Sequence, residues 1–298
     1  MKKRLISCFS SDIRTMTAKE LKNAILASAG RVVLGETVVT SPPLLDGITN
    51  AEVMVAFSAD MILLNEYNVF TKFVYGMEDD ESPIATMKKL TGRPIGINLE
   101  PIDNAGTYLE EIIELPKGRV CSEETFRAAA EQGVDFICLT GNPATGVTNA
   151  GIAAWVSKAK AHFPGLVFAG KMHSAGTSEP VLSEANLLQF VALGADGVLI
   201  PAVGTVPGIG EQEASEIVKK IKAQGAIVMS VVGTSQESAD TNTIRALGLS
   251  NKRVGADIHH LGDGGYGRVP DPENLLALSM CIRGKRHTYF KMCQSVMR

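Results

Sequence analysis

Eight short runs of β-branched and other apolar residues recur along the chain, each followed by a stretch with helical periodicity. The runs begin at intervals of 29 to 41 residues. A strand with its crossover helix and loops takes about 30 residues or more, so this spacing predicts strands joined by helical crossovers. The expected strands are Val32–Glu36, Met61–Asn65, Ile95–Glu100, Phe136–Thr140, Leu166–Lys171, Gly197–Pro201, Ile227–Ser230 and Ala256–His260.

The segments between these runs carry start and stop signals of helices. Residues 17–20 form a capping box that opens a leading helix ahead of the first strand. Ser82 and Pro83 open another helix and Gly92 ends it, while Asp271 and Pro272 open the last one. Further helices are expected at residues 122–132, 149–162, 179–193, 211–223 and 238–247, with a short extra helix around 108–114 in the longest gap.

The expected strands are apolar on both faces, as in Phe136-Ile137-Cys138-Leu139. This pattern is typical of a parallel sheet buried on both sides. Eight such strands alternating with helices in 298 residues predict an α/β fold, a closed (β/α)8 TIM barrel with an N-terminal leading helix. A doubly wound open sheet is the alternative, but no G-x-G-x-x-G sequence follows the first strand. No linker divides the chain, so we expect residues 1–298 to form a single domain.

Composition excludes several classes of protein. Lys and Arg number 29 against 32 Asp and Glu, which leaves no basic excess for nucleic-acid binding. No apolar run approaches the roughly 18 residues of a membrane helix, and the one after Lys2-Lys3-Arg4 is too short for a secretion signal. Five scattered cysteines without a C-x-x-C pair fit a reducing compartment.

We therefore expect a cytoplasmic protein with no nucleic-acid or membrane partner. Apolar side chains in the basic C-terminal segment indicate packing against a second subunit, and hence a homo-oligomer. They are Met280, Phe290, Met292 and Met297.

Catalytic residues of such barrels lie at the carboxyl ends of the strands and in the loops that follow. Lys171 and His173 are two positions apart at the end of the fifth strand, so both are expected to face the barrel mouth. Apolar neighbours would lower the pKa of Lys171 and favour Schiff-base formation or proton abstraction, with His173 as its acid–base partner. Glu100 is the third catalytic candidate, as a general base. The alternative is that Lys171 neutralises a substrate phosphate or pairs with Glu100.

Other polar residues at strand ends are candidates for substrate binding. His259 and His260 are adjacent, so only one of them can face the barrel mouth. We assign this position to His259, which lies two residues after Asp257 and therefore on the same face. The other candidates are Asn65, Asn98 and Asn142.

Glycine-rich segments follow the last two expected strands. Barrels that bind phosphate monoesters use backbone N–H groups of these two loops. The sequence therefore predicts a small phosphorylated substrate, although such glycines also serve tight turns alone. The residues concerned are Gly233 and Thr234 in the first loop and Gly262, Gly264 and Gly265 in the second.

No spacing of His, Cys, Asp or Glu matches a defined metal motif, so no metal ligand is assigned and no cofactor is firmly implied. Magnesium remains an open alternative, because Glu36, Asp46 and Glu100 are oxygen donors near expected strand ends.

Two segments resemble known families. Residues 167–173, Val-Phe-Ala-Gly-Lys-Met-His, resemble the Val-Lys-His strand of the BtpA-like barrels of bacteria. Gly264-Gly265-Tyr266-Gly267 after Asp263 looks like the Asp-x-Gly-Tyr-Gly stretch of the phosphoenolpyruvate mutase and isocitrate lyase group. In that group the stretch belongs to an early strand and binds magnesium, whereas here it follows the last strand, and the Lys-Cys-Gly-His loop of the lyases is absent. The resemblance implies a related barrel and no shared activity.

Together these features predict an enzyme that acts on a small phosphorylated, sugar-derived metabolite as a lyase, aldolase or isomerase. A metal-assisted hydrolase that uses Glu36, Asp46 or Glu100 with His259 is a second hypothesis. A barrel that binds a phosphorylated metabolite without catalysis is the third.

Overall fold

Eight parallel strands form a closed barrel in chain order, and the last strand pairs with the first. The structure is a computed structural model that describes residues 3–174 and 176–298. The predicted (β/α)8 fold is confirmed, and every expected strand lies within two residues of its observed ends. The strands are β1 (Val32–Val38), β2 (Met61–Asn65), β3 (Ile95–Leu99), β4 (Phe136–Leu139), β5 (Leu166–Gly170), β6 (Gly197–Pro201), β7 (Ile227–Val232) and β8 (Ile258–Leu261).

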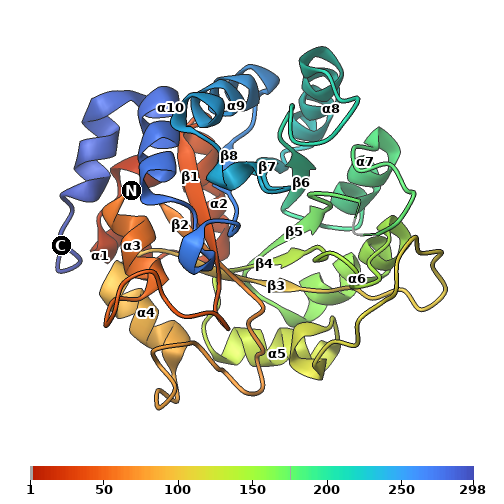
Figure 1. Ribbon diagram of the computed structural model, residues 1–298, viewed down its shortest axis with the longest axis horizontal. Coiled ribbons are helices and arrows are strands. Elements are labelled where there is room, and N and C mark those ends of the chain that lie inside the picture. Colours follow the sequence, from red (N-terminus) through yellow and green to blue (C-terminus); the bar gives the residue numbers. More distant parts are fainter. Residues whose placement is uncertain (1–2, 175) are drawn as a thin grey trace.

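Helices follow the strands and surround the barrel (Figure 1). The α-helices are α1 (Ser10–Arg14), α2 (Ala18–Ala27), α3 (Asn50–Ala56), α4 (Pro83–Thr91), α5 (Glu123–Glu131), α6 (Asn149–His162), α7 (Glu184–Ala192), α8 (Glu211–Ala223), α9 (Thr241–Val254) and α10 (Pro272–Met292). Short 3-10 helices are η1 (Leu5–Ser7), η2 (Lys117–Arg119), η3 (Gln236–Ser238) and η4 (Tyr266–Arg268). None of the helices within residues 3–174 and 176–298 is both long and apolar enough to cross a membrane.

The cap signals act as predicted. Thr17 and Glu20 form the reciprocal capping box of α2. Gly92 ends α4 with a φ of 63°, a left-handed conformation that glycine adopts without steric cost.

Three expectations about helices are wrong, and one observed helix was not expected. The helix expected at residues 238–247 is α9, which begins at Thr241 and ends at Val254. Residues 108–114 form no helix, because their backbone N–H groups bind other loops: Leu109 donates to Gly176 O and Ile113 to Ala144 O. Helix α7 begins at Glu184 rather than at residue 179. Helix α3 was not expected, since its seven residues are too few to show periodicity, although Thr49 and Glu52 form a capping box there.

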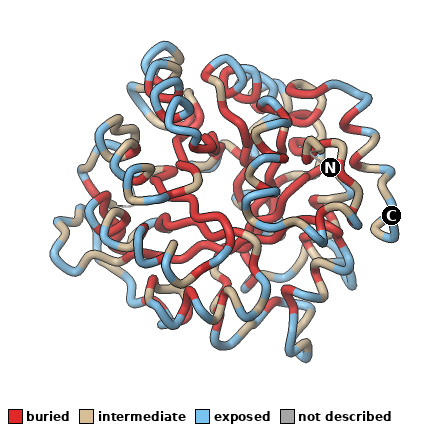
Figure 2. The backbone as a smooth tube through the Cα atoms, turned by 180° about the vertical axis from the view of Figure 1, so that it is seen from behind, coloured by how far each residue is buried: buried red, intermediate tan, exposed pale blue. Residues whose placement is uncertain are grey.

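Side chains of the strands alternate between two apolar layers, because successive residues point to opposite faces. The outer layer packs against the helices, and the inner layer fills the barrel. In the inner layer, the rings of Phe136 and Phe168 meet edge to face, with their centroids 5.9 Å apart. A Cβ on Gly96 would lie 2.2 Å from the Phe136 ring, so only glycine fits there. Figure 2 shows the buried strands inside and the exposed positions on the outer helices. The interior of the barrel is therefore filled by side chains.

A buried ion cluster fastens α10 to the barrel. Asp60, just ahead of β2, accepts hydrogen bonds from Val33 N (2.9 Å) and from the guanidinium of Arg283. Lys291 Nζ lies 3.6 Å from the other oxygen of Asp60, and all three charged side chains are fully buried. Burial lowers the pKa of Lys291 to about 7, and the charge of Asp60 opposes this shift. Nearby, Phe290 packs against Phe9 of the same chain, with ring centroids 5.5 Å apart.

The substitution Asp60→Asn is expected to destabilise the fold, because it leaves two buried cations without their anion. The free energy of unfolding should fall by about 3–5 kcal/mol, measured by urea titration. The control is Glu184→Gln, which breaks the exposed pair with Lys220 (2.7 Å) and should cost less than about 1 kcal/mol. Equal losses in the two variants would show that the cluster does not fasten α10.

Candidate active site

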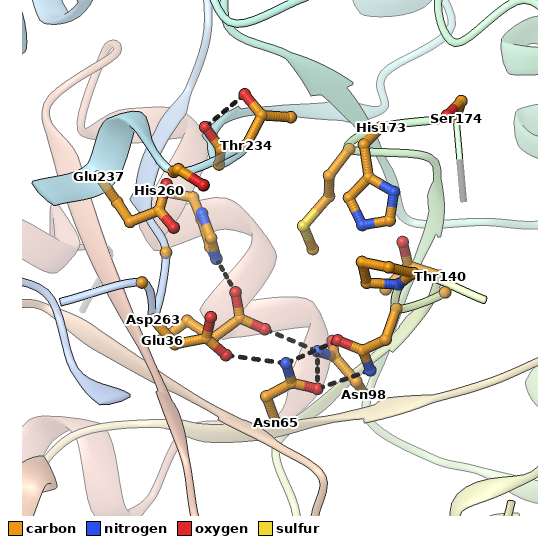
Figure 3. A pocket seen from close by; sticks show the side chains of 18 of the residues that line it. Glu36, Asn65, Asn98, Thr140, His173, Ser174, Thr234, Glu237, His260 and Asp263 are labelled. Carbon is orange, nitrogen blue, oxygen red and sulfur yellow. Dashed lines mark hydrogen bonds and ion pairs between the residues drawn. The ribbon is translucent and has the colours of Figure 1, made fainter. Parts of the chain in front are cut away.

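A cavity of about 500 Å³ opens at the carboxyl ends of the strands. Its walls include the loops after β7 and β8. Figure 3 shows His173 on one side of this cavity and His260 with Glu237 on the other. The strand-end residues that line it are Glu36, Asn65, Asn98, Thr140, His173 and His260.

Carboxamide side chains connect two carboxyl groups at the base of the cavity. Asn98 Nδ2 donates to Glu36 Oε1 (2.6 Å) and to Asn65 Oδ1 (3.1 Å). Asn65 Nδ2 donates in turn to Asp263 Oδ2 (2.8 Å). His260 Nε2 lies 2.9 Å from the second oxygen of Glu36. These contacts fix the orientation of Glu36 and Asp263 from neighbouring strands, which is what acid–base chemistry needs.

Two buried oxygens beside this network have no hydrogen-bond partner within the part of the chain that the structure describes. They are Asn98 Oδ1 and Thr140 Oγ1. Buried polar atoms are normally paired, so these two oxygens are available to a ligand.

The environment of the cavity shifts the protonation of its groups. Burial, followed by the charge of Glu36, raises the pKa of Asp263 to about 7, and the hydrogen bond from Asn65 opposes this. Burial lowers the pKa of His173, and the nearby charge of Lys171 lowers it further. Near neutral pH, Asp263 can therefore both accept and donate a proton, while His173 is uncharged.

The prediction that Lys171 faces the barrel mouth is wrong. Strand β5 ends at Gly170, and Lys171 lies buried on the outer side, where Ala169 also packs. Its Nζ binds Thr177 Oγ1 (2.8 Å) and Glu179 Oε2 (3.2 Å). These two contacts hold the loop that carries His173 into the cavity, so the geometry makes Lys171 a positioning residue.

Glu100 does not line the cavity either. Its Oε1 binds Arg119 Nη2 (2.7 Å), and its two oxygens accept hydrogen bonds from the backbone and side chain of Asn142 (3.1 Å each). The alternative that Lys171 pairs with Glu100 is also wrong, because the long segment after β3 brings Arg119 to this carboxylate and Lys171 pairs with Glu179. Glu100 thus positions Asn142, which does line the cavity.

The assignment of His259 to the mouth is also wrong. Its Nε2 lies 3.0 Å from Gly30 O, and burial lowers the pKa of its ring to about 4. Ile258 packs inside the barrel, so its neighbour His259 points to the outer face. Asp257 and His259 are two positions apart, as expected, but the face they share is the outer one. His260 is therefore the histidine that reaches the cavity.

The predicted glycine-rich loops do reach the cavity. Gly233, Thr234, Gly262 and Gly264 line it. Gly265 instead serves the turn, because a Cβ at this position would lie 2.2 Å from Val269 O. Phosphate binding by these loops stays a prediction.

Sequence reasoning missed four charged groups that line the cavity: Glu110, Glu237, Asp263 and Arg268. Asp263 would have been found by also considering the polar side chains of the loop that follows β8. Glu237 and Arg268 lie in irregular loops, where no periodicity indicates the direction of a side chain.

The carboxylates considered as magnesium ligands are not brought together. Glu36 lines the cavity, Glu100 is bound to Arg119, and Asp46 is exposed in the loop after β1. Within residues 3–174 and 176–298, no group of three or more His, Cys, Asp and Glu side chains is arranged to hold a metal ion.

The fold and the polar cavity define a (β/α)8 barrel with its candidate site at the usual end. The chain belongs to the family described as "Domain of unknown function (DUF7916)", whose model matches residues 6–298. No curated protein matches the chain. The family match does not name the BtpA-like proteins, so that resemblance stays a prediction.

Several solved structures share the fold. An archaeal fructose 1,6-bisphosphate aldolase is 14% identical, with 86% of this chain and 95% of that chain covered and a TM-score of 0.53. Oxaloacetate acetylhydrolase in complex with the product oxalate is 13% identical, with 82% of this chain and 79% of that chain covered and a TM-score of 0.51. 2,3-Dimethylmalate lyase, described as a member of the PEP mutase/isocitrate lyase superfamily, is 13% identical, with 82% of this chain and 80% of that chain covered and a TM-score of 0.50. At these identities the likeness shows the fold alone.

Replacing Lys171 by Met is expected to raise the pKa of His173, because it removes a positive charge that lowers this pKa. NMR titration of the ring protons measures the effect, and the chain has only five histidines to assign. The control Lys158→Met removes an equal charge from an exposed lysine that lies over the ring of Trp155. An unchanged His173 pKa in Lys171→Met would contradict the positioning role.

Proposed function

We propose that this protein is an enzyme that cleaves a carbon–carbon bond in, or isomerises, a small phosphorylated metabolite through an enolate. The observation that carries this proposal is the pair of carboxyl groups, Glu36 and Asp263, joined by carboxamides at the base of the cavity. A buried carboxyl group whose pKa is raised toward neutrality, as that of Asp263 is, is typical of acid–base catalysis. The fold that it shares with lyases and an aldolase supports the same reaction class.

Asp263 is the group that we assign to proton transfer. Its ionised carboxylate would take the proton of a substrate hydroxyl in a cleavage, or of a carbon next to a carbonyl in an isomerisation. In a cleavage, the deprotonated hydroxyl becomes a carbonyl group as the carbon–carbon bond breaks, and the electron pair of that bond moves onto the oxygen of the adjacent carbonyl. In an isomerisation, the electron pair comes from the broken carbon–hydrogen bond. Uncharged His173 across the cavity would donate a hydrogen bond to the resulting enolate oxygen. Asp263 then returns the proton to carbon, so that the enzyme ends in its starting state.

The loops after β7 and β8 are the proposed binding site for the phosphate group. Gly233 and Gly264 bring backbone to the cavity wall, whereas Gly262 N already donates to Val232 O (3.0 Å). Arg268 also lines this wall, and its guanidinium makes no hydrogen bond within the described part of the chain. It would supply the positive charge. The first N–H groups of α9 are not available, because Asp240 caps them.

Incubation in D₂O with a panel of ketose phosphates, aldose phosphates and 2-oxo acids tests the proposed reaction class. We expect at least one compound to gain deuterium next to its carbonyl or to be cleaved, as followed by NMR. A panel in which no compound exchanges or is cleaved would contradict the proposal.

With a substrate found in this way, Asp263→Asn should lower kcat by about 10²- to 10⁴-fold, because general acid–base groups contribute this much. In the wild-type enzyme kcat should rise with pH through about 7, since the acting base is the ionised form of Asp263. This rise should vanish in Asp263→Asn. The control Asp46→Asn removes an exposed carboxylate outside the cavity and should leave kcat unchanged. An unchanged kcat in Asp263→Asn would exclude Asp263 as the base.

A further inference from the structure

Glu237 is a carboxyl group of the cavity wall that the proposed acid–base chemistry does not use. It lies in η3, in the loop after β7, and is only 6% exposed. Figure 3 shows its side chain beside His260 on the wall opposite His173. Its place is on the same wall as the loops proposed to bind phosphate.

Two neighbouring segments hold this carboxyl group in place. Asn274 of α10 donates from Nδ2 to Glu237 O (3.0 Å) and to Ala239 O (2.7 Å), which fixes the backbone of the loop. The side chain packs directly on Gly264, where a Cβ would lie 1.9 Å from Glu237 Oε1. Glycine at position 264 is therefore required by space, and the carboxyl group is built into the β8 loop.

The second oxygen of this carboxyl group is left unpaired. Glu237 Oε2 is buried and has no hydrogen-bond partner among the residues that the structure describes. Burial, and less strongly the charge of Glu36, raise the pKa of Glu237, while its backbone contacts and His260 oppose the shift. A buried carboxyl oxygen without a partner is costly, so this oxygen is expected to meet a ligand group.

We propose that Glu237 and the phosphate group of the substrate share a proton, so that binding of the dianion is accompanied by uptake of one proton. An ionised Glu237 would repel a phosphate dianion at this wall. With a proton between Glu237 Oε2 and a phosphate oxygen, the repulsion becomes a hydrogen bond, and the unpaired oxygen gains its partner. The inference rests on the proposed phosphate site and adds the group that makes this site sensitive to pH.

The hydroxyl group of Thr234 does not take this role. Its Oγ1 donates to Thr205 O (2.7 Å) and also lies 2.6 Å from Gly233 O, so its proton is already used within the loop. Glu237 is then the buried side chain of this loop that can supply a hydrogen-bond donor to an anion.

Sulfate is the probe for the test, because it has the shape of phosphate and keeps its charge between pH 6 and 9. Calorimetric titration should show that the wild-type affinity falls about tenfold per pH unit above the pKa of Glu237. Titration in buffers of different ionisation enthalpy should show uptake of about one proton. In Glu237→Gln the amide always donates, so binding should persist without pH dependence or proton uptake.

The matched control is Glu110→Gln, which removes a negative charge from an exposed carboxylate that lines the same cavity. It should keep the pH dependence of the wild type. Gly264→Ala should weaken sulfate binding at low pH and reduce its pH dependence, because its Cβ displaces the carboxyl group of Glu237. Melting temperatures of the variants show whether each one is folded.

Sulfate binding that has the same pH dependence in the wild type and in Glu237→Gln overturns the shared proton and leaves the proposed phosphate site intact. Absence of both sulfate and inorganic phosphate binding in every folded variant, from pH 6 to 9, overturns the phosphate site and the shared proton together.

Discussion

The pairing of β8 with β1 is the interaction on which the site depends. Its register places His260 beside Leu34, so the first and last strands reach the barrel mouth side by side. Glu36 and Asp263 are far apart in the sequence, yet they meet there through Asn65 and Asn98. Because the lower barrel is filled with apolar side chains, ligands can approach these groups only from the carboxyl ends of the strands.

The cavity holds more acidic than basic side chains. Glu36, Glu110, Glu237 and Asp263 line it, and Arg268 is the arginine among the lining residues. Burial raises the pKa of both Glu237 and Asp263, since an ionised carboxylate is poorly solvated there. The two groups thus hold protons at pH values where surface carboxyl groups have lost theirs, and this property connects the proposed catalysis with the proposed mode of binding.

Periodicity in the sequence was sufficient to predict the barrel and most of its strand-end residues, including Asn98 and His173. The expectation that Lys171 and His173 share a face failed, because β5 ends at Gly170 and alternation does not relate two residues beyond the strand. Alternation also shows which residues share a face but not which face is inside, so His259 was chosen instead of His260. Glu237 lies in an irregular loop, where its direction depends on contacts with Gly264 that are formed only in the folded chain.

The central claim is that burial and the charge of Glu36 together raise the pKa of Asp263, and a titration of the side-chain carboxyl carbons by ¹³C NMR tests it most directly. In the wild-type protein, Asp263 should titrate near pH 7. In Glu36→Gln its pKa should fall, because the repelling charge is gone, while burial keeps it above the ordinary value of about 4. An Asp263 carboxyl group that titrates near pH 4 in both proteins would contradict the claim.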